Sequence, residues 1–351
     1  MVKITAVGVG PRGDVAFPNV STSPAGDFAQ PRLTAHRLAW FRALLRGFRH
    51  SGWLLTAESD GETRGLLPLV LVRGPLFGRF LVSLPYVNTG GIWAADEQAA
   101  RLLADEACEL ADRQRVRFLE LRHEVPLGHP AFNYQRTEKQ HLRLNLPDSD
   151  EALDRSFKSK LRSQIRKSGQ YGLEVTFGGA ESLNDFYDVF AVNMRDLGTP
   201  VFDKRLFAAV LEEFQGDAEI CLVRSQTHTV AAALLVHAGG VTEVPSASSL
   251  RDWNHTNANM LMYRHLLRRA IGRGSGQFDF GRSSEGSGTY RFKRQWGAEP
   301  FPAVWQYYVR SGSPEEMRPE SAGKRRLVRI WQRLPVGLTR RIGPPIVRGI
   351  P

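Results

Sequence analysis

A segment of the chain near residue 280 brings together side chains that could bind an anion and stabilise a developing negative charge. It reads Phe278-Asp-Phe-Gly-Arg-Ser-Ser-Glu-Gly-Ser-Gly-Thr-Tyr-Arg-Phe-Lys-Arg-Gln-Trp-Gly297. Arg282 and Lys293 are cationic donors, Tyr290 could donate a proton, Trp296 offers a flat surface, and Gly281 ends the expected strand. We expect a glycine-rich loop after this strand that binds an anionic or acyl-carrying ligand. A plain surface loop with an aromatic anchor is the competing interpretation.

Two carboxylates are candidates for a general base. Asp279 lies within the segment and could orient Arg282, act as the base or form a structural ion pair. Asp196 follows Arg195 in the segment Met194-Arg-Asp-Leu-Gly-Thr-Pro200 and is the alternative base. The sequence leaves the choice between them open.

Residues 153–168, which precede both of these segments, predict an amphipathic basic helix. At about 100° per residue, one stripe of this helix is apolar and another is basic. The apolar stripe holds Leu153, Phe157, Leu161 and Ile165, and the basic one Arg155, Lys158, Arg162 and Arg166. Aligned arginines could clamp the phosphate of an acceptor, because guanidinium donors match its oxygens in pairs. A docked helix with a solvated charged back is the alternative.

The sequence supports neither a metal centre nor a resident cofactor. Gly8-Val-Gly-Pro-Arg-Gly13 has dinucleotide-loop spacing, but no helix pattern follows it. P-loop and nucleophile-elbow motifs are missing, and His123 and His129 lack metal-site spacing. Cys108 and Cys221 are far apart and read as buried small hydrophobes.

The elements that must position these side chains recur along the chain. A helix at residues 34–48, a hairpin at 53–72, a helix at 97–113 and a strand at 116–121 are followed by the same order at residues 186–280. In sequence, Thr63–Val70 aligns with Thr229–Val236, and Phe118–Arg122 aligns with Phe278–Arg282. We therefore expect two copies of one mixed α/β domain, at 34–150 and 151–310, between a loop segment at 1–33 and a tail at 311–351.

Composition places the chain among soluble globular proteins. Its 351 residues are 42% hydrophobic and 24% charged, which excludes disordered, collagen-like and disulfide-scaffold classes. The longest apolar run, Gly65–Val72, is too short to span a bilayer. The first seventeen residues lack the apolar core of a signal peptide. We expect a cytoplasmic protein.

Most of the positive charge lies in the tail. Residues 324–351 hold eight basic residues and no acid, whereas the rest of the chain has a net charge of only +3 out of the total +11. Leu327, Trp331, Leu334 and Leu338 are spaced to share a helix face, with Pro335 ending or kinking the helix. The tail either packs on the domain or contacts the anionic inner face of the cytoplasmic membrane.

Three of these segments together resemble the FemAB-related proteins, and more narrowly the branch associated with exosortase and PEP-CTERM systems. They are F-D-F-G-R-S followed by G-x-G-x-Y-x-F-K-x-x-W-G, the segment 194–200, and Lys160-Leu-Arg-Ser-Gln-Ile-Arg-Lys167. The resemblance covers residues 35–310 and extends to the tail. It implies a tandem pair of GNAT-like domains that transfers an acyl or aminoacyl group to an amine of a cell-envelope or exopolysaccharide precursor.

The resemblance leaves the donor open between acyl-CoA and aminoacyl-tRNA. The chain has no glycine in Arg251-Asp-Trp-Asn-His-Thr-Asn-Ala-Asn259, where GNAT enzymes carry a pyrophosphate loop. It also lacks a heptad segment for the helical arm of the peptidoglycan enzymes, which bears on the tRNA donor.

We expect the substrate amine to attack the bound ester or thioester directly, so that positioning and oxyanion stabilisation matter more than a covalent nucleophile. The catalytic candidates are Arg282, Lys293, Tyr290, Asp279 and Asp196. The substrate-binding candidates are Lys158, Arg162, Arg166, Arg195, Asn259, Gly281 and Trp296. A non-catalytic scaffold at the membrane surface is the alternative function, and binding of nucleic acid is a third.

Overall fold

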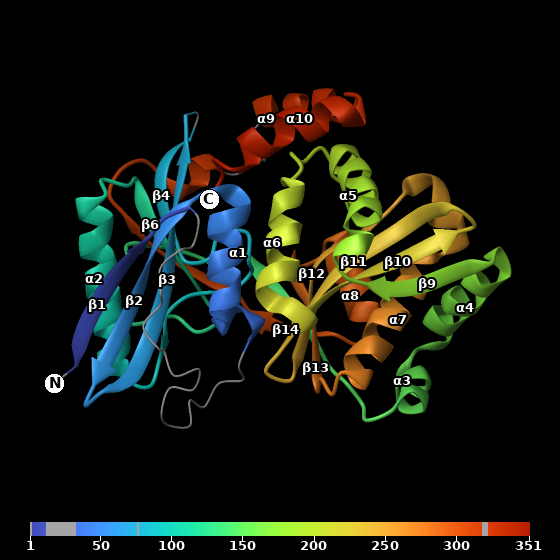
Figure 1. Cartoon of the computed structure of the whole chain (residues 1–351), viewed down its shortest axis with the longest axis horizontal. Helices are drawn as coiled ribbons and strands as arrows, with labels where there is room; N and C mark the ends of the chain where they lie inside the picture. Colours follow the sequence, from blue (N-terminus) through green and yellow to red (C-terminus); the bar gives the residue numbers. More distant parts are fainter. Residues whose placement is uncertain (1, 12–32, 76, 318–321) are drawn as a thin grey trace.

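The structure is a computed structural model, and it describes residues 2–11, 33–75, 77–317 and 322–351 (Figure 1). Residues 12–32 of the expected N-terminal loop lie outside the described residues. The beginning of that segment is a strand, β1 (Lys3–Val9), which pairs antiparallel with β2 (Ser51–Ser59) over its whole length. The N-terminal segment is therefore part of the first sheet.

The chain forms two sheets with the same strand arrangement. The first runs in the order β1, β2, β3 (Glu62–Gly74), β4 (Gly78–Val82), β6 (Phe118–His123), β15 (Val304–Val309), β7 (Tyr134–Arg136), with β5 (Trp93–Ala94) paired to β3. The second runs in the order β9 (Leu173–Gly178), β10 (Ala218–Ser225), β11 (His228–Ala238), β12 (Val241–Ser249), β13 (Gln277–Ser284), β8 (Lys139–Asn145), β14 (Glu299–Pro302). In each sheet one central pair is parallel, β4 with β6 and β12 with β13. The internal repeat expected from the sequence is thus present in the fold.

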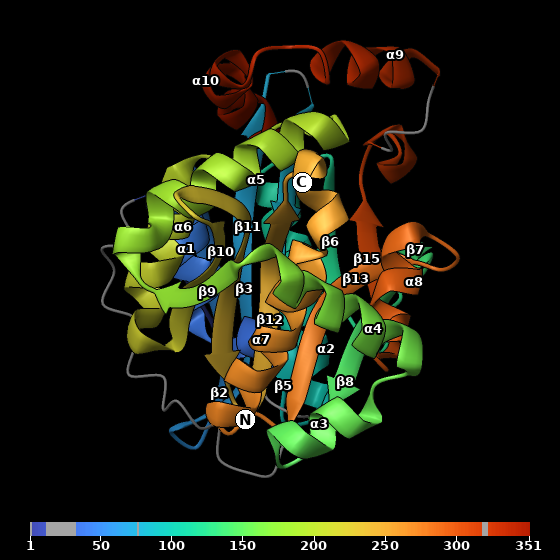
Figure 2. The ribbon, with the colours of Figure 1, turned by 90° about the vertical axis from the view of Figure 1, so that its right-hand side faces the viewer.

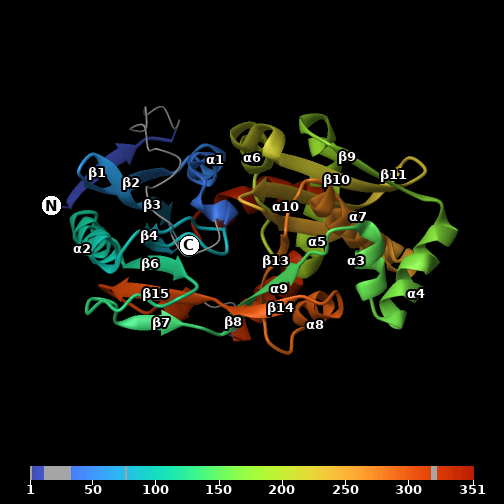
Figure 3. The same ribbon diagram turned by 90° about the horizontal axis from the view of Figure 1, so that it is seen from below.

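Helices cover both faces of each sheet and share a central core. Between the sheets lie α1 (Leu38–Phe48), α5 (Leu183–Leu197) and α6 (Lys204–Phe214), while α2 (Glu97–Arg113) covers the outer face of the first sheet and α7 (Ala258–Gly272) that of the second (Figures 1 and 3). Strand periodicity produces these layers: in β3, Leu66, Val70 and Val72 enter the central core, and Leu67, Leu69 and Leu71 pack against α2. Both halves therefore bury one continuous core between them.

The two halves exchange a strand, and the exchange departs from the expected boundaries at residues 150 and 310. β8 follows the first repeat in sequence but pairs with β13 of the second sheet, and β15 follows the second repeat but pairs with β6 of the first. Each sheet is completed by the other half of the chain. The crossing strands bring β6, β8, β13 and β15 together at the junction of the halves.

Several expected elements hold and two change. The hairpins at 53–72 and 220–236 and the helices at 97–113 and 204–214 are present. The helix expected at 153–168 is instead α3 (Asp150–Ser156) and α4 (Ser159–Ser168), because Phe157 and Lys158 are extended and the Phe157 ring packs edge-on at 5.4 Å from Trp296. The loop expected after Gly281 contains the end of β13, which runs to Ser284, and then a helix, α8 (Gly288–Gln295), capped by the Ser287 hydroxyl.

The basic tail forms two helices, α9 (Ala322–Trp331) and α10 (Val336–Val347), which lie across the end of the molecule (Figure 2). Pro335 is the N-cap of α10, so the tail breaks where the sequence predicted. Leu327 and Leu338 are exposed, unlike the half-buried Trp331 and Leu334, so these four residues do not form one packed face. Among the described residues, no helix has the length and apolarity needed to cross a bilayer.

Candidate active site

The site lies where two parallel strands of the second sheet separate. β12 pairs with β13 only through residues 241–243 and 277–279, and the last pair is Glu243 with Asp279. Beyond this pair β12 continues along β11, and β13 continues along β8. The register of β13 against β8 shifts between Asp279 and Arg282, and Gly281 has φ +73° there. Bulges of this kind redirect side chains at the end of a strand.

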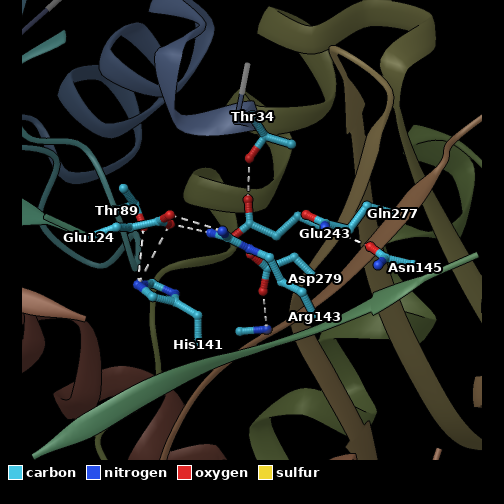
Figure 4. Close-up of polar contacts among 10 residues, drawn as sticks. Thr34, Thr89, Glu124, His141, Arg143, Asn145, Glu243, Gln277 and Asp279 are labelled. Atoms are coloured by element: carbon cyan, nitrogen blue, oxygen red, sulfur yellow. Dashed lines mark hydrogen bonds and ion pairs between the residues drawn. The ribbon is translucent and has the colours of Figure 1, made fainter. Parts of the chain in front are cut away.

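Glu243 is a buried carboxyl whose hydrogen-bond partners come from the first half of the chain. The Thr34 hydroxyl donates to its Oε2 (Figure 4), and the Asn88 side chain also bonds to Glu243. Burial raises the pKa of Glu243 to about 7, and the nearby charge of Asp279 adds to this rise. A small pocket is lined by Thr34, Asn88, Glu243 and Asp279. Glu243 can therefore exchange a proton near neutral pH.

Asp279 is held by ion pairing and does not contact Arg282. Arg143 donates from Nε to Asp279 Oδ2 at 2.8 Å, and the Gly281 backbone N–H donates to Oδ1 at 2.6 Å. The other nitrogens of Arg143 bond to both oxygens of Glu124 (Figure 4). This network identifies the structural ion pair, out of the three roles that the sequence left open, as the one with direct contacts.

His141 lies behind this network without access to solvent. Its Nε2 is 3.3 Å from the Thr89 hydroxyl and 4.0 Å from Glu124 Oε1. Burial lowers the pKa of His141, so the ring is neutral at pH 7. It supports Glu124 and Thr89 on the side of the pocket away from Glu243.

Lys293 and Arg282 form the cationic side of the site. The ammonium of Lys293 donates to the Arg282 carbonyl at 3.2 Å, and burial lowers its pKa to about 8. The Arg282 guanidinium stacks 3.6 Å from the centre of the Trp305 ring, and burial together with Arg122 lowers its pKa to about 9. Arg122 stacks on the same ring at 3.9 Å but is paired with Glu120 at 2.6 Å. In the described part of the chain, no carboxylate forms an ion pair with Arg282 or Lys293.

Gly281 joins the acidic and cationic sides. A Cβ at this position would lie 2.9 Å from Asn88 Nδ2 and 4.0 Å from Lys293 Nζ. The left-handed φ also disfavours any side chain. Asn88, which bonds to Glu243, and the ammonium of Lys293 therefore both lie within 4.0 Å of the point that a Cβ at residue 281 would occupy.

The structure brings four of the predicted residues together: Asp279, Gly281, Arg282 and Lys293. The remaining catalytic candidates lie elsewhere or make other contacts. Arg195 and Asp196 pair with each other at 2.5 Å, and Asp196 O accepts bonds from Arg251 and the tail residue Gln332. Tyr290 is half-buried on α8, where its backbone N–H bonds to the Ser287 cap.

The substrate-binding candidates are also dispersed. Lys158, Arg162 and Arg166 are exposed at α4, and the break between α3 and α4 removes the continuous stripe through Arg155. Asn259 lies in the first turn of α7. Trp296 is 2% exposed and packs in the core against Phe157, so it offers no open surface to a substrate.

Sequence reasoning missed Glu243 and its partners Thr34 and Asn88. Glu243 lies in a strand whose flanking residues Val241 and Val244 enter the core, and a single carboxylate in such a strand was its only signal. Thr34 and Asn88 are ordinary residues of the first half and carry no local pattern. Their association with Glu243 depends on how the halves dock.

The corresponding point of the first sheet is closed. Its last parallel pair is Val82 with Glu120. The loop after β4 then bonds along β6: Ser83 N donates to Glu120 O, and the N–H groups of Gly90 and Gly91 donate to Arg122 O. The backbone carbonyls of Glu120 and Arg122 in β6 are thereby hydrogen-bonded, at the position where β13 of the second sheet separates from β12.

Comparison with known proteins identifies the fold. Residues 155–294 match the family described as Acetyltransferase (GNAT) domain. The crystal structure of FemX is 16% identical, with 83% of this chain and 94% of that chain covered and a TM-score of 0.58. The structure of L-PGS from Bacillus licheniformis is 15% identical, with coverage of 84% and 93% and a TM-score of 0.54. No curated protein matches the sequence.

A tandem GNAT protein from the clavulanic acid biosynthesis pathway is 12% identical, with 89% of this chain and all of that chain covered and a TM-score of 0.51. The chain therefore has a tandem GNAT-like fold with a GNAT-type acetyltransferase domain in its second half. The expected fold class is confirmed.

Proposed function

We propose that this protein transfers an acyl or aminoacyl group from an activated ester or thioester to a substrate amine, at the point where β12 and β13 separate. The observation that carries the proposal is that two ionisable side chains near Gly281, Glu243 and Lys293, have shifted pKa values. Burial raises the pKa of Glu243 to about 7 and lowers the pKa of Lys293 to about 8. An acid and a base with pKa values near the working pH are typical of general acid–base sites.

In this mechanism the amine nitrogen attacks the carbonyl carbon of the donor. The Glu243 carboxylate accepts the proton that the nitrogen loses, and Thr34 and Asn88 hold that carboxylate by hydrogen bonds. The Lys293 ammonium, which lies beside Gly281, stabilises the negative charge that develops on the carbonyl oxygen. The carbon–sulfur or carbon–oxygen bond then breaks, and the leaving group takes the proton that Glu243 accepted, so that it departs as a thiol or hydroxyl and Glu243 returns to its carboxylate form. The enzyme forms no covalent intermediate.

Arg282 provides a second positive charge beside Lys293. Its guanidinium has one face on Trp305 and forms no ion pair with a carboxylate of the described residues, so an approaching anion would be drawn to it. We assign Arg282 to a phosphate or carboxylate group of a substrate. The exposed Arg162 and Arg166 on α4 could contact only parts of a substrate that extend out of the site.

The donor is acyl-CoA or aminoacyl-tRNA, and α7 bears on the choice. The helix begins after Asn257, which has φ +56°, so asparagine makes here the left-handed turn that glycine makes in pyrophosphate loops. In the first turn the Ala258 N–H bonds to the Thr256 hydroxyl, and the N–H groups of Met260 and Leu261 bond to Asn257 O, which leaves the Asn259 N–H for a phosphate. The missing glycine therefore does not exclude acyl-CoA.

The acceptor we propose is an amine of a cell-envelope or exopolysaccharide precursor, as the resemblance to the exosortase-associated branch implies. The similarity in fold to FemX and to L-PGS supports acceptors of the cell envelope in general.

The test is to incubate the purified full-length protein with acyl-CoA and aminoacyl-tRNA pools together with lipid-linked saccharides, and to identify products by mass spectrometry. We expect a product that carries the mass of the transferred group, formed by the wild type and absent with Arg282→Ala/Lys293→Ala. Hydrogen–deuterium exchange confirms that the double variant is folded. A folded double variant with full activity would refute the assignment of the cationic side.

A further inference from the structure

We propose that the outer face of the C-terminal tail is a docking surface for a membrane that contains anionic lipids. The proposal does not depend on the proposed transfer reaction, because it concerns the surface formed by α9 and α10. Neither helix lines the Glu243 pocket. It rests on how the tail is held, on which side chains it leaves exposed, and on their charge.

The tail is fixed to both halves of the protein by its inner face. In α10, Thr339, Gly343 and Val347 are buried, and Gly343 packs against Val201. The Tyr86 hydroxyl donates to Val347 O at 3.1 Å. The helix therefore lies across both halves and presents a fixed outer face.

The same holds for α9. Val328 packs against Gly198, and Gln332 donates to Asp196 O at 2.9 Å, so these two side chains mark the inner side of the helix. At about 100° per residue, Ile330 lies directly opposite them. Ile330 is 49% exposed and Leu327, on the same outer side, is 65% exposed.

Exposed apolar side chains concentrate at this surface. Six large hydrophobic residues are exposed among the described residues, and three of them are Leu327, Ile330 and Leu338 in the tail. A fourth, Leu197, is adjacent to Gly198, on which α9 packs. Isolated exposed hydrophobic residues need no explanation, but a group of them on one outer face indicates a binding surface.

The positive charge on the outer face of the tail indicates an anionic partner. The exposed side chains around the apolar group include Arg326, Arg329, Arg333 and Arg341. Residues 324–351 contain no acid, and the one ion pair of the described tail side chains joins Arg340 to Asp188 on the inner side. Arginines surrounding exposed leucine and isoleucine fit an anionic bilayer, where the guanidinium groups meet phosphates and the apolar side chains enter the acyl boundary.

A second basic helix provides a matched comparison. α4 and the end of α3 expose Arg155, Lys160 and Lys167, which make no ion pair among the described residues. Neither α3 nor α4 contributes a large exposed hydrophobic side chain. If positive charge alone caused membrane binding, α4 would bind as well as the tail.

The experiment measures co-sedimentation of the full-length protein with vesicles of phosphatidylcholine alone and of phosphatidylcholine with one quarter phosphatidylglycerol. We expect binding only to the anionic vesicles, weakening as salt is raised. Arg326→Gln/Arg329→Gln/Arg333→Gln should bind about 100-fold more weakly, because each basic residue near the surface contributes separately. The control Arg155→Gln/Lys160→Gln/Lys167→Gln should bind as the wild type does.

A second variant separates lipid from other polyanions. Leu327→Ser/Ile330→Ser keeps every charge and should weaken vesicle binding about tenfold, because both side chains lose their insertion into the acyl boundary. Thermal unfolding checks that each variant is folded; deletion of the tail is avoided because it would uncover Val201 and Tyr86. No binding by the wild type, equal binding by the arginine variant, or tRNA binding through these arginines with vesicle binding unaffected by the serine variant would overturn the proposal.

Discussion

The two sheets of this protein have the same strand order but differ where their parallel strands part. In the first sheet the last pair is Val82 with Glu120, and the single carboxylate is neutralised by Arg122. In the second it is Glu243 with Asp279, and Arg143 pairs with Asp279 and Glu124 but forms no ion pair with Glu243. The second sheet therefore keeps one buried carboxyl whose partners are a hydroxyl and an amide, which is the condition for a raised pKa.

The backbone differs at the same place. After β4 the loop bonds back to β6 through Ser83, Gly90 and Gly91, so the first sheet has no free strand edge there. β13 instead turns away at Gly281 and leaves room for Asn88 and Lys293 beside it. The candidate site therefore lies in the second sheet and not at the matching point of the first. The first half of the chain contributes Thr34 and Asn88 as hydrogen-bond partners of Glu243.

The largest effect should come from exchanging the carboxyl of the second sheet. Glu243→Gln preserves shape and hydrogen bonding but cannot accept a proton, so we expect kcat/KM to fall about 10²- to 10⁴-fold. The matched change in the first sheet, Glu120→Gln, should keep the rate within about tenfold. Steady-state kinetics at pH 8 on folded protein measures both. Equal losses in the two variants would mean that the sheets do not differ in role.

The second largest effect should come from changes to Lys293 on the cationic side of the site. Lys293→Ala should reduce kcat by about 10²- to 10³-fold, because one donor to the developing oxyanion is lost. Lys293→Arg should recover part of the rate, whereas a purely structural lysine would give no such recovery. Arg291→Ala, on the exposed side of the same helix, serves as the control and should leave kcat unchanged.

Stability should depend strongly on the buried carboxylate of the first sheet. Glu120 and Arg122 are both nearly fully buried, so Glu120→Gln leaves a buried guanidinium without its counter-charge. We expect a loss of about 3 kcal/mol in the free energy of unfolding, measured by urea denaturation. The exposed pair Glu97–Arg101 gives the comparison, and Glu97→Gln there should cost about 0.3 kcal/mol. A cost for Glu120→Gln as small as that would show that the first carboxylate is dispensable.

The smallest effect is the dependence of rate on pH. Glu243 must be ionised, so kcat/KM should rise with pH up to its pKa of about 7. Lys293 must be protonated, so the rate should fall as pH passes its pKa of about 8. The profile is then a bell with its maximum between these values and limbs of about tenfold per pH unit. Lys293→Arg should move the alkaline limb upward, and a profile unaffected by that change would exclude Lys293 as the acid group.

Local sequence patterns predicted much of the secondary structure and the domain repeat. Apolar runs on both sides of a turn segment predicted the hairpins, helical spacing predicted α2 and α6, and the repeat of these patterns predicted two copies of one domain. The same reasoning failed at residues 153–168 and 288–295. There the packing of Phe157 on Trp296 and the Ser287 cap decide the outcome, and spacing does not record either contact.

The sequence by itself determined the cationic side of the site, because Gly281, Arg282 and Lys293 lie within thirteen residues of one strand–helix unit. Only the tertiary structure decided the acidic side. Thr34 and Glu243 are 209 positions apart, and they meet because β8 and β15 cross between the sheets and lock the two halves together. A pKa depends on burial and on neighbouring charge, and both are set by that docking.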